Sequence, residues 1–225
     1  MKRLAMTIAL AAFAVSAAAG IPEEWKAKAN QSGELIKKGN YALALKITDG
    51  LIDEMMNALG PGEGSTQLFA IVVMFKAFAE EGLGKADEAA WYWQTAVSIL
   101  PKIVDSNLAS SFGDLAKRLK DVPLEPIPAP LASTAQPSWP RIVRKVEPVY
   151  PRGALAFNVS GPAKVKVVIT KDGAVRTPRI LDSLPAPTLM YAALEAVKQW
   201  RFEPARQDGQ PIETLFVLTI NFRKR

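Results

Sequence analysis

The chain has 225 residues, a formal net charge of +6, and neither Cys nor His. That length accommodates two modest domains, each with its own core. Without Cys there is no disulfide, thiolate metal site or thiol nucleophile, and without His the commonest general base and metal ligand are missing. These absences argue against an enzyme, and we predict no catalytic residue, metal ligand or cofactor.

The first nineteen residues have the pattern of a signal peptide. Lys2 and Arg3 precede an apolar run, and Ala17-Ala18-Ala19 fits the small-residue rule for signal peptidase cleavage. The run, Leu4–Ala19, has 16 residues, fewer than the ~20 needed to span a bilayer. We therefore expect residues 1–19 to be removed and the protein to reside in the periplasm. The alternative is an uncleaved inner-membrane anchor that leaves the protein facing the periplasm.

Residues 20–120 are predicted to form a helical domain, because apolar residues recur there at helical spacing. Turns at Lys38–Tyr41 and Gly82–Lys85 and a loop at Gly60–Ser65 interrupt the pattern. Ser65 or Thr66 is placed to cap the helix that follows this loop. Residues 103–120 can supply a closing helix.

Two segments of this region resemble tetratricopeptide (TPR) helical hairpins. The phrase GLGKADEAAWYWQTAVSILP resembles the second half of such a repeat, and GNYALAL resembles the same point in an earlier one. The offset from Gly39 to Gly84 is 45 residues, longer than the usual ~34, so the match is degenerate. Two interpretations stay open, a concave peptide-binding face or a small helical bundle that packs only on itself.

Three aromatic residues, Trp91, Tyr92 and Trp93, are adjacent on one of the predicted helices. Neighbours on a helix point about 100° apart, so the three cannot share one buried face. We expect either an exposed aromatic side chain or, preferably, cover from a second domain or a neighbouring helix.

Proline marks a boundary at residues 121–140, where six prolines occur among twenty residues. Such a stretch favours an extended polyproline-like chain and is typical of a linker. At ~3.1 Å per residue it reaches only a few nanometres.

Residues 141–225 predict a small α+β domain after an extended lead-in at residues 141–149. Alternating and 3.6-residue apolar patterns, together with the hairpin signal Asp172-Gly173, define its elements. The expected elements are a helix over 152–158, a strand around 165–169, a turn at 171–174, a strand over 175–181, a helix around 189–200 and a closing strand that ends at 222.

Four segments of this region carry a recognisable pattern: YPRGALAFNVSG, KVKVVITKDGAV, LDSLPAPTLMYAALEAVKQWRFEPA and ETLFVLTINF. They resemble the TonB C-terminal domain family, with a departure at Gly161-Pro162-Ala163, where the family more often runs directly from Gly into the strand. The resemblance implies an α + (α+β) fold class: TPR-like hairpins, a Pro-rich linker, and a domain with a three-stranded antiparallel sheet and two helices. In such a domain Trp200 and Phe202 belong to the core.

In that family the domain grips the TonB box, a short peptide of an outer-membrane receptor, by strand addition along the last strand. A three-stranded sheet has two free edges, and Pro178 blunts one of them because proline cannot donate to a ladder. The last strand has no proline, so its amides are available for a partner. The predicted partner-binding residues are Thr214, Leu215, Phe216, Val217, Leu218, Thr219 and Ile220, with Leu155, Phe157, Asn158 and Val159, which match the family segment near the bound peptide.

The predicted function is therefore a periplasmic adaptor that binds a TonB-dependent outer-membrane receptor or another envelope protein. Residues 121–225 hold 15 basic and 9 acidic side chains, but the export signal argues against nucleic acid as a partner. The alternative is an energy transducer that couples the proton-motive force from ExbB–ExbD to transport through an uncleaved anchor. The missing His and the short linker weigh against it. An open strand edge also allows a strand-exchanged homodimer.

Overall fold

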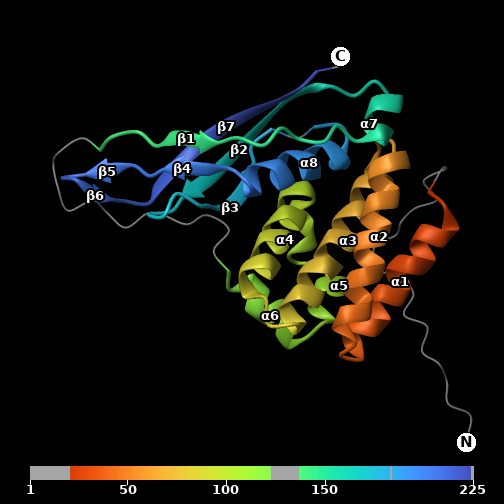
Figure 1. The fold of residues 1–225 in the computed structure, drawn as a ribbon. Helices are drawn as coiled ribbons and strands as arrows, with labels where there is room; N and C mark the ends of the chain where they lie inside the picture. Colours follow the sequence, from red (N-terminus) through yellow and green to blue (C-terminus); the bar gives the residue numbers. More distant parts are fainter. Residues whose placement is uncertain (1–20, 123–136, 183, 224–225) are drawn as a thin grey trace, which may run out of the picture.

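The computed structural model describes residues 21–122, 137–182 and 184–223. The predicted signal peptide and most of the predicted linker lie outside the described residues. We call residues 21–122 the helical unit and the described residues from 137 onward the C-terminal unit (Figure 1).

The helical unit consists of four long helices followed by short ones. Consecutive long helices pack against each other, as their short connections require. Gly39 and Gly84 adopt positive φ angles of 76° and 78° at the two predicted turns, where a residue without Cβ avoids strain. The helices are α1 (Glu23–Lys37), α2 (Tyr41–Ala58), α3 (Glu63–Gly82), α4 (Ala86–Ile99), the 3-10 turn η1 (Pro101–Ile103), α5 (Asn107–Ser110) and α6 (Asp114–Lys120).

Two local predictions for this unit were wrong. Helix α3 begins at Glu63, so Ser65 and Thr66 lie inside it rather than at its cap, and the Thr66 hydroxyl donates to the Gly62 carbonyl at 2.9 Å. The expected closing helix is split, because α5 ends at Ser110 and α6 begins only at Asp114, after Gly113 with its φ of 58°. The residues that close the helical core are nonetheless those with helical spacing, including Phe112, Leu115 and Leu119.

The C-terminal unit has a three-stranded antiparallel sheet in the order β3-β2-β7 and two helices, which confirms the predicted fold class. Two further pairs, β1 with β4 and β5 with β6, extend to one side as an arm (Figure 1). The elements are β1 (Arg141–Arg144), α7 (Arg152–Ala156), β2 (Gly161–Ile169), β3 (Val175–Ile180), α8 (Pro187–Lys198), β4 (Arg201–Glu203), β5 (Arg206–Gln207), β6 (Gln210–Pro211) and β7 (Thr214–Phe222).

Helix α8 lies between the sheet and the helical unit. On the sheet side, Leu189, Val197 and Trp200 are buried with the inward residues of β2 and β7. The indole N–H of Trp200 donates to the Val146 carbonyl at 2.8 Å, and Phe202 is buried beside it. Both aromatic residues thus belong to the core, as the sequence predicts.

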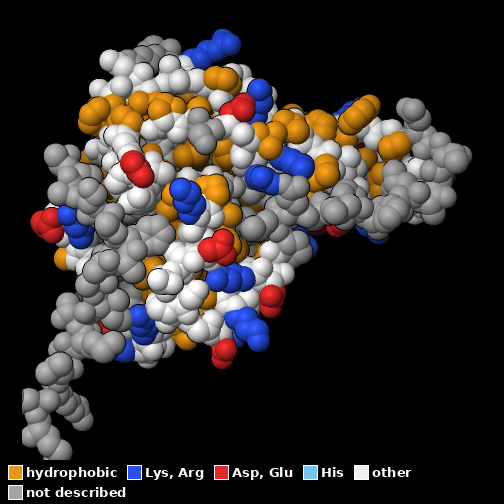
Figure 2. Space-filling view, turned by 180° about the vertical axis from the view of Figure 1, so that it is seen from behind, with side chains coloured by type: hydrophobic (Ala, Val, Ile, Leu, Met, Phe, Trp, Pro, Cys, Tyr) orange, Lys and Arg blue, Asp and Glu red, His pale blue; other side chains and the backbone are white. Residues whose placement is uncertain are grey.

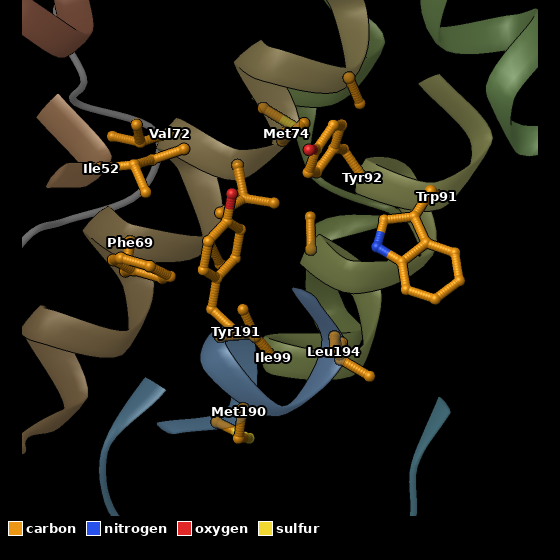
Figure 3. Close-up of a cluster of buried hydrophobic side chains, with 14 of the residues drawn as sticks. Ile52, Phe69, Val72, Met74, Trp91, Tyr92, Ile99, Met190, Tyr191 and Leu194 are labelled. Carbon is orange, nitrogen blue, oxygen red and sulfur yellow. The ribbon is translucent and has the colours of Figure 1, made fainter. Parts of the chain in front are cut away.

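The other side of α8 is also buried, because it packs on α3 and α4. Tyr191 inserts between these helices, with its ring 5.5 Å from that of Phe69 and 6.5 Å from that of Tyr92 (Figure 3). Trp91, Tyr92 and Trp93 are all buried, so none of the trio is the exposed aromatic side chain that helix geometry allowed. Tyr92 is covered by Tyr191 of the C-terminal unit, which agrees with the expected cover from a second domain. The two units share one continuous core.

Charged groups surround this apolar junction. Lys198 of α8 pairs with Glu88 of α4, and Lys76 of α3 pairs with Asp49 of α2 at 2.7 Å. Burial raises the pKa of the Glu195 carboxyl, while the neighbouring Lys198 and Lys76 act in the opposite direction. Helix α8 is therefore held to the helical unit by the Lys198–Glu88 ion pair as well as by packing.

Candidate protein-binding edge

The sheet has two outer strands, and the helical unit covers one of them. Helix α4 runs beside β3, where Ser98 meets the backbone of that strand. The Ser98 hydroxyl donates to the Pro178 carbonyl and accepts from the Ile180 amide, both at 3.4 Å. Pro178 itself has no N–H to leave unpaired. A helix side chain and a proline together close this edge to another strand.

Strand β7 forms the opposite edge, and it pairs only with β2 among the described residues. Its nine residues make it the longest open edge of the described chain. Strand β1 is also open on one side, but it spans four residues and its pairing with β4 shifts register after Ile142. The predicted pairing strand, Thr214–Ile220, lies entirely within β7.

The register shows which β7 amides face outward. The Leu181 amide donates to the Lys164 carbonyl at 2.9 Å, so the backbone groups of Lys164 point to β3. Backbone groups of successive strand residues point to opposite sides, so those of Val165 point to its β7 partner, Leu218. The amides of Leu215, Val217 and Thr219 must then point to the open edge. Those of Phe216, Leu218 and Ile220 point into the existing ladder.

The side chains of β7 alternate between the two faces of the sheet. Leu218, Ile220 and Phe222 are buried on the helix side, and Phe216 is half-buried there. Leu215 and Val217 face the other side, with exposed fractions of 37% and 52%. Seen from behind, hydrophobic side chains gather over the upper part of the molecule, where the C-terminal unit lies (Figure 2). A strand added to β7 therefore finds apolar neighbours on both faces.

The second group of predicted site residues does not act as one surface. Leu155 is 44% exposed and lines a hollow with Asn221 and Phe222 at the end of β7. The ring of Phe157 lies instead against Gly60 of the helical unit. Val159 is buried, and its carbonyl accepts a hydrogen bond from the Tyr150 hydroxyl. Asn158 has a positive φ and forms the turn after α7. Only Leu155 is thus placed beside β7 by its side chain.

Ser98 is the residue that sequence reasoning missed. A serine inside a helix has no local feature that marks it as the cover of a strand 80 residues away. Within the described residues, no group of three or more acidic side chains is arranged to hold a metal ion. The same part of the chain contains no helix with the length and apolar character needed to cross a membrane.

Comparisons with known proteins agree with this geometry. Residues 146–223 match the family model "Gram-negative bacterial TonB protein C-terminal". Protein TonB of Klebsiella pneumoniae is 34% identical over 102 residues, which is 42% of this chain and 40% of that protein. Protein TonB of Escherichia coli K12 is 35% identical over 92 residues, which is 41% of this chain and 37% of that protein. The chain thus spans about two fifths of the length of these relatives.

A solved structure shows the same likeness in sequence. The solution NMR structure of the Pseudomonas aeruginosa TonB C-terminal domain is 32% identical, covers 39% of this chain and 91% of that one, and has a TM-score of 0.34. The TonB C-terminal domain belongs to a family of non-enzymatic envelope proteins. Residues 146–223 of this chain are therefore similar in sequence to the C-terminal domain of TonB proteins.

Proposed function

We propose that this protein is a periplasmic adaptor that binds an extended segment of an outer-membrane receptor or another envelope protein by strand addition to β7. The observation that carries the proposal is the asymmetry of the sheet. Its β3 edge is closed by Ser98 and Pro178, whereas β7 is unpaired on its outer side within the described residues. The family resemblance supports the same edge.

The geometry of β7 suits an extended peptide. Main-chain bonds from the outward amides supply affinity without regard to sequence, and the alternating side chains supply selectivity. Thr214 to Ile220 form the proposed contact strand, and Leu155 extends it at the far end. A partner with apolar residues at alternate positions can pack beside Leu215 and Val217 on one face and Phe216 on the other.

The proposed organisation follows the sequence boundaries. Residues 1–19 serve as a signal peptide, 20–120 as the TPR-like domain, 121–140 as the linker and 141–225 as the partner-binding domain. The alternative role, energy transduction from ExbB–ExbD, requires residues 1–19 to stay as a membrane anchor. The short linker favours the adaptor, because it reaches only a few nanometres.

Substitution of Val217 by proline tests the strand assignment. The change removes an amide that points to the open edge and leaves the ladder with β2 intact, so the fold is expected to survive. We predict that capture of TonB-box peptides falls at least about tenfold, since one lost main-chain bond and a blocked neighbour together exceed ~1.4 kcal/mol. Isothermal titration calorimetry measures the loss.

The matched control is Val217→Thr, which keeps the amide and the branched shape at Cβ. It is expected to bind within about twofold of the native chain, a change well below 1 kcal/mol. If Val217→Pro folds and binds like the native chain, the partner does not pair with β7.

A further inference from the structure

A cleft of about 890 Å³ lies where the helical unit meets the C-terminal unit. Helices α2 and α8 form two of its walls, and the segment from Val146 to Val149 forms a third. Ile52, Met56, Val149 and Ala192 supply apolar lining, and Val149 is 79% exposed. The TonB family resemblance does not account for this cleft, because α2 lies outside residues 146–223.

The charge of the cleft is predominantly negative. Asp49, Asp53, Glu147 and Glu195 line it, against the single cation Lys76. Asp49 pairs with Lys76, and Glu147 pairs with Lys145 at 2.6 Å. Asp53 is exposed and has no ion pair within the described residues, and Oε1 of Glu195 is buried there without a hydrogen-bond partner. The cleft therefore presents the exposed carboxylate of Asp53 and the mostly buried carboxyl of Glu195, whose pKa is raised by burial, beside apolar surface.

The cleft shares a lining residue with a hollow at the end of β7. A second hollow of about 720 Å³ is lined by Tyr150, Leu155, Asn221 and Phe222, and Glu147 lines both spaces. A chain that pairs with β7 as far as Asn221 would therefore leave the sheet near Glu147, at the border of the cleft.

We propose that the cleft binds a Lys- or Arg-containing extended segment that continues from the strand paired with β7. The proposal rests on the proposed function and assigns to the helical unit a share in recognising the same partner. Basic side chains meet Asp53 and Glu195, while the apolar stems of Lys or Arg lie along Met56 and Val149. The helical unit thereby selects among partners that carry similar strands.

The test uses the full chain and two kinds of synthetic peptide, a TonB-box peptide alone and the same peptide with a four-residue Lys/Arg extension at either end. Both ends are extended because the added strand can run parallel or antiparallel to β7, and the direction decides which end lies near the cleft. We expect one extension to tighten binding by about fivefold to tenfold, from two partly exposed ion pairs. The gain is expected to shrink in 0.5 M salt, because salt screens such pairs.

Charge reversal locates the effect. Asp53→Lys is expected to abolish the gain from the extension and to leave binding of the unextended peptide unchanged. Asp105→Lys, an equal change in charge at an exposed position that does not line the cleft, is expected to preserve the gain. Equal effects of the two reversals, or no gain from either extension, would overturn the proposal.

The same titrations separate this proposal from the one for β7. If the unextended peptide fails to bind the native chain, the β7 assignment fails. If an extended peptide still binds in that case, and the binding is lost in Asp53→Lys, the cleft binds basic segments without strand addition at β7. If no extended peptide binds, the cleft proposal fails as well.

Discussion

Single residues hold the turns and edges of the C-terminal unit in place, and Gly173 is the clearest case. It has a φ of 80° in the turn between β2 and β3, and its carbonyl accepts the Phe202 amide at 2.9 Å. A Cβ at this position would lie 1.8 Å from the Phe202 carbonyl oxygen. The hairpin therefore needs glycine for two reasons, its backbone conformation and its contact with β4.

Gly173→Ala is expected to destabilise the protein by about 3 kcal/mol or more, since overpacking adds to the ~1–2 kcal/mol cost of a positive φ. Gly209→Ala is the matched control, because Gly209 has a φ of 79° and a Cβ there would meet no atom of the described residues within 4 Å. Gly209→Ala is expected to lower the free energy of unfolding only by the ~1–2 kcal/mol that a positive φ costs. Urea denaturation measures both, and equal losses would show that the contact with Phe202 does not matter.

At the scale of elements, the local patterns that the sequence carries were sufficient for most of the C-terminal unit. The alternation in the last strand, the Asp172-Gly173 hairpin and the helix before Trp200 all correspond to observed elements. The helix predicted over 152–158 ends earlier, at Ala156, because Asn158 adopts a φ of 58°. Strand β2 begins at Gly161 and includes Pro162, which pairs with Asn221 beyond the end of β3.

What the sequence could not show is how elements distant in the chain meet. Helix α8 buries Leu189 and Val197 with the sheet, and Tyr191 and Leu194 on its other side are buried as well, because a second layer of helices covers them. The closure of β3 by Ser98 likewise depends on the packing of two units. The candidate edge was predictable from the alternating apolar residues of β7, whereas the reason that it is the open edge was not.

At the scale of the whole molecule, the two units depend on each other. The aromatic junction of Phe69, Tyr92 and Tyr191 belongs to the same core as the sheet (Figure 3). Removal of the helical unit would expose one side of α8 and the β3 edge together. Unpaired edges and apolar patches of this kind promote association between copies.

We therefore predict that residues 137–225, produced alone, associate at micromolar concentration. Light scattering coupled to size-exclusion chromatography is expected to give a mass above that of one fragment, growing with concentration. The full chain under the same conditions is the comparison. A folded fragment that remains a monomer would show that the helical unit is not needed to cover these surfaces.

Amide hydrogen exchange along β7, measured by NMR with and without a TonB-box peptide, tests the central claim most directly. The amides of Phe216, Leu218 and Ile220 face β2 and are expected to exchange slowly in both states. Those of Leu215, Val217 and Thr219 face the open edge and are expected to exchange quickly until the peptide binds, then to slow by at least about tenfold as new main-chain bonds form. Binding that leaves these three amides unprotected, or that protects another strand instead, would contradict strand addition at β7.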